Sequence, residues 1–366
     1  MPSTYSPQGS TPVPIAQGGT GAVTQPAALN NLLPAQPGNA AKLLTTDANN
    51  ASWQNFSGLG SNVDLALADV VPIYHGGVDA NINADRLLAY FHPGICDFRL
   101  SAVNGDPVGD TGVGVTSNTL YLVPWNGNRI CLWDGSRWRL YTTAQLSLSL
   151  AGVVSGNAYD VFVYDNAGTL TLELFQWTSV TARVALGSQD GILVKGSDAK
   201  RRFLGSICSG TSGVVEDSAV KRFVWNAYNR LRRPLIITDP TSTWTDNSNV
   251  WHQARANGAN CVQLMCGNAY SMLDLDVTAC FYASAVWVTV LTGVGEDVTN
   301  GIVNQTVCRG DSQVANGPVT FSTGRLQKFA PLGYHSYNWL LYVAPSGQTA
   351  TILGTNYSGI QGLFEC

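Results

Sequence analysis

The sequence predicts a mainly β fold with one short helix, and two features of its composition support this. Charged residues make up 12% of the 366-residue chain, about half the usual share of a soluble protein, and Glu occurs only four times. Gly, Ser, Thr and Asn (38, 28, 30 and 27 residues) form about a third of the chain. This composition excludes a long charged coiled coil and most helical enzymes, whose exposed faces need Glu, Lys and Ala.

Changes in composition along the chain predict five segments. They are an extended segment (1–60), a small mixed linker domain (61–120), a β-rich domain (121–215), a helix (216–234) and a C-terminal β-sandwich or jelly-roll-like domain (235–366).

Residues 1–60 are rich in proline and glycine and contain a single basic residue, Lys42. Prolines at positions 2, 7, 12 and 14 favour an extended path. The stretch Gln17–Gly21 has no following Lys and no preceding strand, so it is not a phosphate-binding loop. Because the segment has little clustered apolar sequence, we expect it to lie against a partner chain.

The next segments contain clear strand and turn signals. Val70–Tyr74 predicts a strand, and Asn83 is a suitable N-cap for a helix that Pro93 ends. Asp134-Gly135 lies between two apolar runs and predicts a hairpin. Tyr159–Tyr164 and the alternating stretch Leu170–Leu174 predict two further strands.

Residues 216–233 carry the strongest helix pattern. Acidic residues at its start and arginines near its end complement a helix dipole, and Pro234 would stop the helix. Four apolar residues follow at coiled-coil spacings of 4, 3 and 4: Val220, Val224, Ala227 and Leu231. We favour the axis of a homotrimer for this seam, and a helix that covers a sheet within a monomer is the alternative.

Residues 235–366 contain apolar stretches separated by loops rich in Gly, Asn, Ser and Thr, and we expect about eight strands there. The stretches are 235–238, 261–265, 276–291, 339–343, 349–353 and 360–364. That spacing is typical of a compact β-sandwich or jelly roll.

The eight cysteines include no CxxC pair. We expect mainly buried structural thiols, with disulfides or a metal site as alternatives. His92 and Cys96 have no further ligands nearby, so helix-end packing is the simpler interpretation of this pair. We therefore predict no metal and no cofactor.

The net charge of −4 gives no electrostatic basis for nucleic-acid binding. The apolar runs are too short to span a bilayer, and the first residues lack the pattern of a signal peptide. We therefore expect synthesis in a cytoplasm without membrane insertion.

Catalytic motifs such as GxSxG, HExxH and a P-loop are absent from the sequence. Asp274 and Asp276 would share one face of a strand and could serve a glycosidase or bind a cation, but two solvated carboxylates are the simpler interpretation. We expect no enzyme.

Neutral sugars are instead bound by exposed aromatic faces near amides and hydroxyls. The candidate contacts are Trp251, Tyr334, His335 and Tyr337. The last three follow the turn residues Pro331 and Gly333, so we expect them in an exposed loop. Trp287, between two valines, is instead expected on a strand in the core.

Several passages resemble fibre proteins of tailed bacteriophages. The N-terminal passage is similar to a repeated tail-fibre segment; it comprises Ile15–Ala22, Ala27–Pro34, Gly38–Asp47 and Ala51–Trp53. Val70–Tyr74 with the helix at Asn83–Phe91, and later Trp133–Trp138, resemble the part that links fibre shafts. Arg202–Gly205 with Lys221–Arg230 resembles a module of fibres and spikes.

The resemblance implies an elongated homotrimeric fibre in the virion, with an N-terminal anchor and a C-terminal domain that faces the host receptor or polysaccharide. The anchor residues would be Ile15, Gln17, Gly18, Gly19, Leu29, Leu32 and Leu33. The alternatives are a head or collar decoration fibre without an obligatory receptor role and a capsule-degrading tailspike.

Overall fold

The computed structural model describes residues 42–46, 51–55, 70–75, 78–109 and 115–366, with side chains from residue 82 onward. The chain divides into two compact units, Met1–Asp69 and Val70–Cys366. In the first unit, β1 (Lys42–Thr46) pairs antiparallel with β2 (Ala51–Asn55). The seven predicted anchor residues lie outside the described residues.

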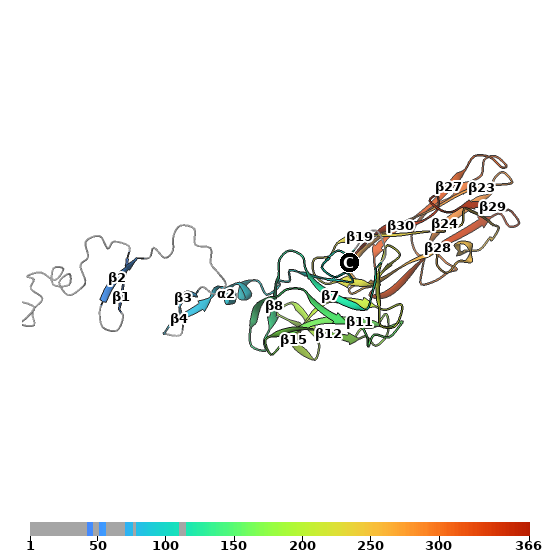
Figure 1. Ribbon diagram of the computed structural model, residues 1–366. Coiled ribbons are helices and arrows are strands. Elements are labelled where there is room, and N and C mark those ends of the chain that lie inside the picture. Colours follow the sequence, from blue (N-terminus) through green and yellow to red (C-terminus); the bar gives the residue numbers. More distant parts are fainter. Residues whose placement is uncertain (1–41, 47–50, 56–69, 76–77, 110–114) are drawn as a thin grey trace, which may run out of the picture. The chain divides into compact units, whose positions relative to one another are not determined.

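The second unit is mainly β, as predicted (Figure 1). It begins with the antiparallel pair β3 (Val70–His75) and β4 (Val78–Asn83), followed by helix α2 (Ala84–Phe91). The helix starts after Asn83 and ends at His92, directly before Pro93, which confirms its predicted position. Proline stops it because the residue before a proline is disfavoured in the α conformation.

The first half of this unit, residues 82–231, is built from three sheets. One has the order β10-β7-β5, a second is the β8-β9 hairpin, and the third has the order β12-β11-β15-β14-β13, with β18 paired to β15. The strands of the first two sheets are β5 (Phe98–Ser101), β7 (Thr119–Pro124), β8 (Arg129–Trp133), β9 (Trp138–Thr142) and β10 (Leu146–Ser149). Those of the third are β11 (Ala158–Asn166), β12 (Thr169–Gln176), β13 (Leu186–Gln189), β14 (Ile192–Lys195), β15 (Asp198–Cys208) and β18 (Val224–Asn226).

Local turn chemistry explains the predicted hairpin at Asp134-Gly135, which is confirmed. Asp134 accepts hydrogen bonds from the N–H groups of Ser136 and Arg137 (2.8 and 3.0 Å) and so closes the loop between β8 and β9. β11 and β12 are joined through Ala167 and Gly168, both at positive φ. Such two-residue turns match the right-handed twist of the paired strands.

The second half, residues 232–366, contains two sheets. The first has the order β19-β30-β23-β27-β25, and β29 pairs with both β20 and β23. Its strands are β19 (Arg232–Thr238), β20 (Thr243–Asp246), β23 (Met272–Ala283), β25 (Thr306–Cys308), β27 (Thr320–Phe329), β29 (Ala350–Leu353) and β30 (Gly359–Glu365).

The second sheet has the order β26-β24-β28-β22-β17-β16-β6, with β21 on β28. Its strands are β6 (Val115–Ser117), β16 (Val215–Asp217), β17 (Lys221–Arg222), β21 (His252–Gln253), β22 (Cys261–Cys266), β24 (Thr289–Glu296), β26 (Gly310–Asp311) and β28 (Gly333–Ala344). Because β6, β16 and β17 belong to the first half, this sheet joins the two halves.

A large apolar core lies between the two sheets of the second half. Along β23, residues at every second position from Leu273 to Phe281 are buried in this core, whereas Asp274 and Asp276 point to the opposite face. Trp339 and Leu341 on β28 supply the other side of the core. Period-2 burial of this kind is the pattern expected for a two-layer β domain.

The predicted helix at 216–234 is wrong, because strands β16, β17 and β18 and the start of β19 occupy this segment. Val224, a predicted axis residue, is buried in the chain's own core, and Val220, Ala227 and Leu231 are half-buried. β-branched and aromatic residues favour strands. Strands β16, β17 and β18 pair with β6, β22 and β15, which are distant in sequence. The helical spacing of apolar residues therefore did not predict the secondary structure of this segment.

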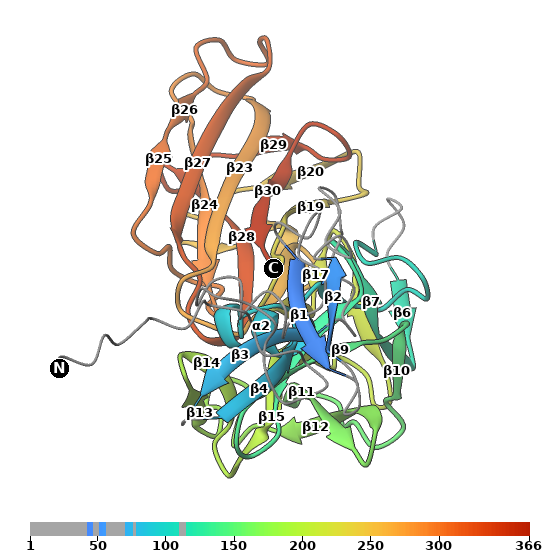
Figure 2. The ribbon, with the colours of Figure 1, turned by 90° about the vertical axis from the view of Figure 1, so that its left-hand side faces the viewer.

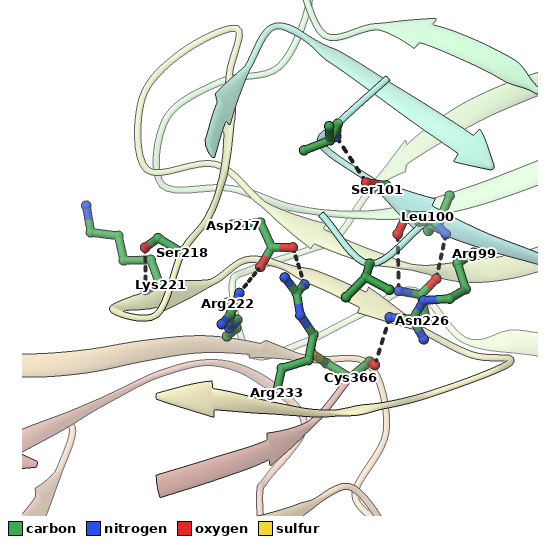
Figure 3. Close-up of polar contacts among 12 residues, drawn as sticks. Arg99, Leu100, Ser101, Asp217, Ser218, Lys221, Arg222, Asn226, Arg233 and Cys366 are labelled. Atoms are coloured by element: carbon green, nitrogen blue, oxygen red, sulfur yellow. Dashed lines mark hydrogen bonds and ion pairs between the residues drawn. The ribbon is translucent and has the colours of Figure 1, made fainter. Parts of the chain in front are cut away.

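A buried charged cluster lies where the two halves meet; we call it the junction cluster (Figure 3). Asp217 accepts hydrogen bonds from Arg222 (3.2 Å) and from Arg233. Arg99 donates to the carbonyl oxygens of Pro107 (2.9 Å) and Cys366 (3.3 Å). Since all four charged side chains are buried, these contacts link β5, β16, β17 and β19 to residue 366 away from solvent.

Candidate functional site

Four loops gather at one end of the second half; we call them the distal loops (residues 246–251, 284–288, 312–319 and 345–349). The strand register places them together, because Ala283 and Asp246 both pair with Ala350, and Thr289 pairs with both Ala344 and Asp311.

The opposite end, which we call the junction end, is where β19 enters and β30 finishes. Twelve residues of β23 separate the two ends, a length of about 35–40 Å. Figure 1 shows the distal loops beyond the labels of β23, β27 and β29.

Trp287 is the most exposed large side chain of the distal loops, with 64% of its surface accessible. The expectation that it lies in the core is therefore wrong. Its backbone has φ 63°, a left-handed conformation that is unusual for a bulky residue and costs on the order of 1–3 kcal/mol.

Hydrogen bonds between two loops hold Trp287 in this conformation. Its N–H donates to the carbonyl oxygen of Ser312 (2.7 Å), and the N–H of Val288 donates to the Ser312 hydroxyl (3.0 Å). The same hydroxyl donates to the carbonyl oxygen of Ala285 (2.7 Å). The exposed indole is thus carried by a backbone that these hydrogen bonds between the two loops hold in place.

The distal loops that carry Trp287 are mainly uncharged: among their residues only Asp246 is charged, and it pairs with His252. Other exposed apolar side chains of the distal loops are Val250, Val286, Val314 and Val319. Gln313 and Asn316, both exposed, add amide groups. This combination suits contact with a neutral, partly apolar surface such as that of a sugar ring.

Trp251, a predicted receptor contact, also lies in the distal loops. Its ring packs at 5.7 Å from that of Tyr342 and it is half-buried. Next to it, His252 bonds Asp246 (2.7 Å), and this hydrogen bond raises the pKa of the imidazole.

The other three predicted contacts lie nearer the junction end, on β28 rather than in a loop. Tyr337 is fully buried and donates to Glu296 (2.9 Å), and burial raises the pKa of its phenol. His335 is buried beside Asp297 (2.7 Å). Tyr334 packs on Phe223 of the first half (ring centroids 5.8 Å), and burial raises its pKa to about 12.

The prediction that Tyr334, His335 and Tyr337 lie in an exposed loop is therefore wrong. Gly333, at φ 117°, already begins β28, so the turn signal of Pro331 and Gly333 ends one residue before Tyr334. Trp287 was missed because the apolar run 276–291 read as strand throughout. The length of that run was the available signal, since strands of more than about ten residues are uncommon and a turn had to lie inside it.

Asp274 and Asp276 do share one face of β23, as predicted. Arg325 on β27 lies opposite them, 3.0 Å from Asp274 and 3.7 Å from Asp276. A single guanidinium thus bridges both carboxylates, and this arrangement is that of an ion pair rather than of an acid and nucleophile pair.

All eight cysteines are free thiols, six of them buried. Within the part of the chain that the structure describes, no three His, Cys, Asp or Glu side chains gather as a metal site would need. Among those same residues, no helix has the length and hydrophobicity needed to cross a membrane.

No family model matches the chain, and no curated protein matches it either. Similar solved structures include Eiger TNF from S. frugiperda (8% identity, TM-score 0.25), which is matched over 37% of this chain and 92% of that chain. They also include the insecticidal delta-endotoxin Cry8Ea1 from Bacillus thuringiensis (8% identity, TM-score 0.23), matched over 69% of this chain and 49% of that chain. TM-scores this low assign neither a fold family nor a function.

Proposed function

We propose that this chain is a structural fibre protein of a tailed-bacteriophage virion, a homotrimer that binds the host surface through its distal loops. The observation that carries the proposal is Trp287, an exposed indole held on a constrained backbone among neutral, apolar neighbours. The passages within residues 1–235 that resemble phage fibre proteins, about half of that range, support the same function, as does the weakly charged composition. No catalytic step is included in it.

The strand order supports a jelly roll for the second half. Eight of its strands can be numbered 1 to 8 in chain order: β19, β22, β23, β24, β26, β27, β28 and β30. With these numbers, the strand orders of the two sheets are 1-8-3-6 and 2-7-4-5. This order is that of two interleaved Greek keys. It brings loops from both sheets to one end, where a ligand would meet several of them at once.

We propose that copies of the chain meet through the outer face of the β19-β30-β23-β27 sheet. Ile236, Leu363, Phe321 and Phe329 are exposed there, and exposed apolar sheet faces favour association. Asp276 and Arg325 are exposed on the same face and pair with each other within the chain (3.7 Å). A mass measurement in solution tests this: Leu363→Asp is expected to give monomers from a wild-type trimer, and a wild-type monomer contradicts the assembly.

Adsorption of particles to host cells tests the role of the distal loops. Trp287→Ala is expected to reduce adsorption about tenfold or more, because one stacking contact is worth roughly 1–3 kcal/mol and repeats in three copies. The matched control is Tyr270→Ala, an equally exposed aromatic in the loop between β22 and β23 at the junction end.

Unchanged adsorption after loss of the whole second half would contradict receptor binding and favour the decoration fibre. Anchoring through residues 1–60 is tested separately: a chain that begins at residue 61 is expected to fold and not to join particles.

A further inference from the structure

A second concave site lies in the first half of the described unit, far along the chain from the distal loops. A cavity of about 530 Å³ opens between α2, the β8-β9 hairpin and the turn from β13 to β14; we call it the α2 cavity. Figure 2 labels α2 and the strands β9, β13 and β14 that lead to its lining residues. This volume falls in the range of small-molecule sites, roughly 300–1,000 Å³. The side chains that matter to its chemistry are Arg86, Tyr90, Trp133, Arg137, Trp138 and Asp190.

Aromatic rings line the α2 cavity. Trp133 and Trp138 are paired directly across the β8-β9 hairpin, and their rings pack edge to face with centroids 5.8 Å apart. Tyr90 on α2 adds a ring that is 77% exposed. A ring face that remains open to solvent beside two fixed indoles suits the apolar face of a sugar.

Asp190 supplies a hydrogen-bond acceptor at the edge of the α2 cavity. Its Oδ2 accepts from Trp138 Nε1 (2.9 Å) and from Gln189 Nε2 (3.1 Å), and the bonds from Gln189 and Trp138 lower the pKa of this carboxyl. Among the described residues Oδ1 has no hydrogen-bond donor. An ionised carboxylate with a spare oxygen can accept from the hydroxyl groups of a sugar.

The residues that line the α2 cavity include two guanidinium groups, those of Arg86 and Arg137, and one carboxylate, that of Asp190. Within the described part of the chain, the guanidinium of Arg86 makes no hydrogen bond and no ion pair. Arg137 lies 3.6 Å from Asp134, whose closer partner is Arg139 at 2.5 Å. The α2 cavity therefore carries an excess of positive charge and favours an anionic ligand, and arginine binds carboxylates through paired hydrogen bonds.

We propose that the α2 cavity binds a sugar unit that carries a carboxylate, such as a uronic acid of a bacterial polysaccharide. Tyr90 and Trp133 contact the ring, Asp190 accepts from its hydroxyl groups, and Arg86 with Arg137 binds the carboxylate. This site differs in place and in ligand charge from the neutral surface around Trp287, and it does not depend on the proposed role of the distal loops.

Calorimetric titration of the full chain with methyl β-D-glucuronide and methyl β-D-glucoside tests the proposal, because these probes differ only in the carboxylate. The glucuronide is expected to bind at least about tenfold more tightly than the glucoside, because one charge-assisted hydrogen bond contributes an effect of this size. Arg86→Gln should abolish that preference, and Tyr90→Ala should weaken both ligands. Equal binding of the two probes, or binding of neither, overturns the proposal.

Three control measurements test whether the glucuronide binds in the α2 cavity itself. Tyr270→Ala removes an exposed aromatic that does not line the α2 cavity and should change nothing. Trp287→Ala should leave glucuronide binding intact, and loss of binding there would place the site in the distal loops and overturn the inference. A lower mass in solution for Tyr90→Ala would show that Tyr90 is a contact between copies, which also overturns it.

Discussion

The junction end and the distal end of the second half use the same kinds of residue in opposite ways. At the junction end, Tyr334 packs on Phe223, and Tyr337 donates a hydrogen bond to Glu296. The buried Asp217 of the junction cluster forms an ion pair with Arg222. At the distal end, Trp287 is exposed although two loops fix its backbone. An aromatic residue therefore contributes stability or recognition according to the end of the strands at which it lies.

This difference predicts that substitutions at the junction end cost stability and that substitutions at the distal end cost binding. The largest effect is expected at Asp217, which binds two buried arginines. Asp217→Asn removes the buried negative charge and should lower the free energy of unfolding by about 3–5 kcal/mol. Urea denaturation measures this loss.

The neighbouring residue provides the control for Asp217. Glu216 pairs with Lys221 at 3.0 Å, but both side chains are about one-third exposed. Glu216→Gln should therefore cost less than about 1 kcal/mol. Equal losses in the two variants would mean that burial of the junction cluster does not determine its contribution.

A smaller loss is expected for Tyr334→Ala at the junction end. The variant removes a half-buried ring and its edge-to-face contact with Phe223, and should destabilise the fold by about 2 kcal/mol. Tyr270→Ala, at a ring that is 75% exposed, should stay within roughly 0.5 kcal/mol. Thermal denaturation compares the two variants, and a reversed order would contradict the contrast between packed and exposed rings.

A weak pH dependence is expected from the distal end. The bond from Asp246 raises the pKa of His252 in the folded state. Its contribution is therefore complete below the unfolded pKa of about 6.5 and is lost as pH rises through the higher folded value. Because the imidazole is partly exposed, the change should stay below about 1 kcal/mol.

His252→Gln should flatten that part of the pH profile of urea midpoints. A profile that keeps the same slope in the variant would assign the pH dependence to another group.

The smallest effect on stability is expected for Trp287→Ala. The exposed ring packs little, so the free energy of unfolding should change by no more than roughly 0.5 kcal/mol, while adsorption falls. A loss of several kcal/mol in denaturation would show that Trp287 is a packing residue, and it would remove the main support for a binding role.

The local features of this protein can be recognised in its sequence. The β8-β9 hairpin follows from Asp134, whose side chain accepts a hydrogen bond from the N–H of Ser136 in the same loop. The end of α2 follows from Pro93. The alternation along β23 placed Asp274 and Asp276 on one face. These features depend on residues within a few positions of one another, so their physical causes can be recognised in the sequence.

The path of residues 216–234 and the exposure of the aromatic residues depend on long-range contacts. Residues 216–234 form strands because β6, β15 and β22, which are far away in sequence, supply their hydrogen-bond partners. Tyr337 is buried because it lies near the junction end of the sheets, and Trp287 is exposed because it lies at the distal end. A local sequence pattern does not say at which end of a sheet a residue lies. Backbone pairing over long sequence distances outweighed a helical spacing of four apolar residues, because a buried strand must pair its N–H and C=O groups.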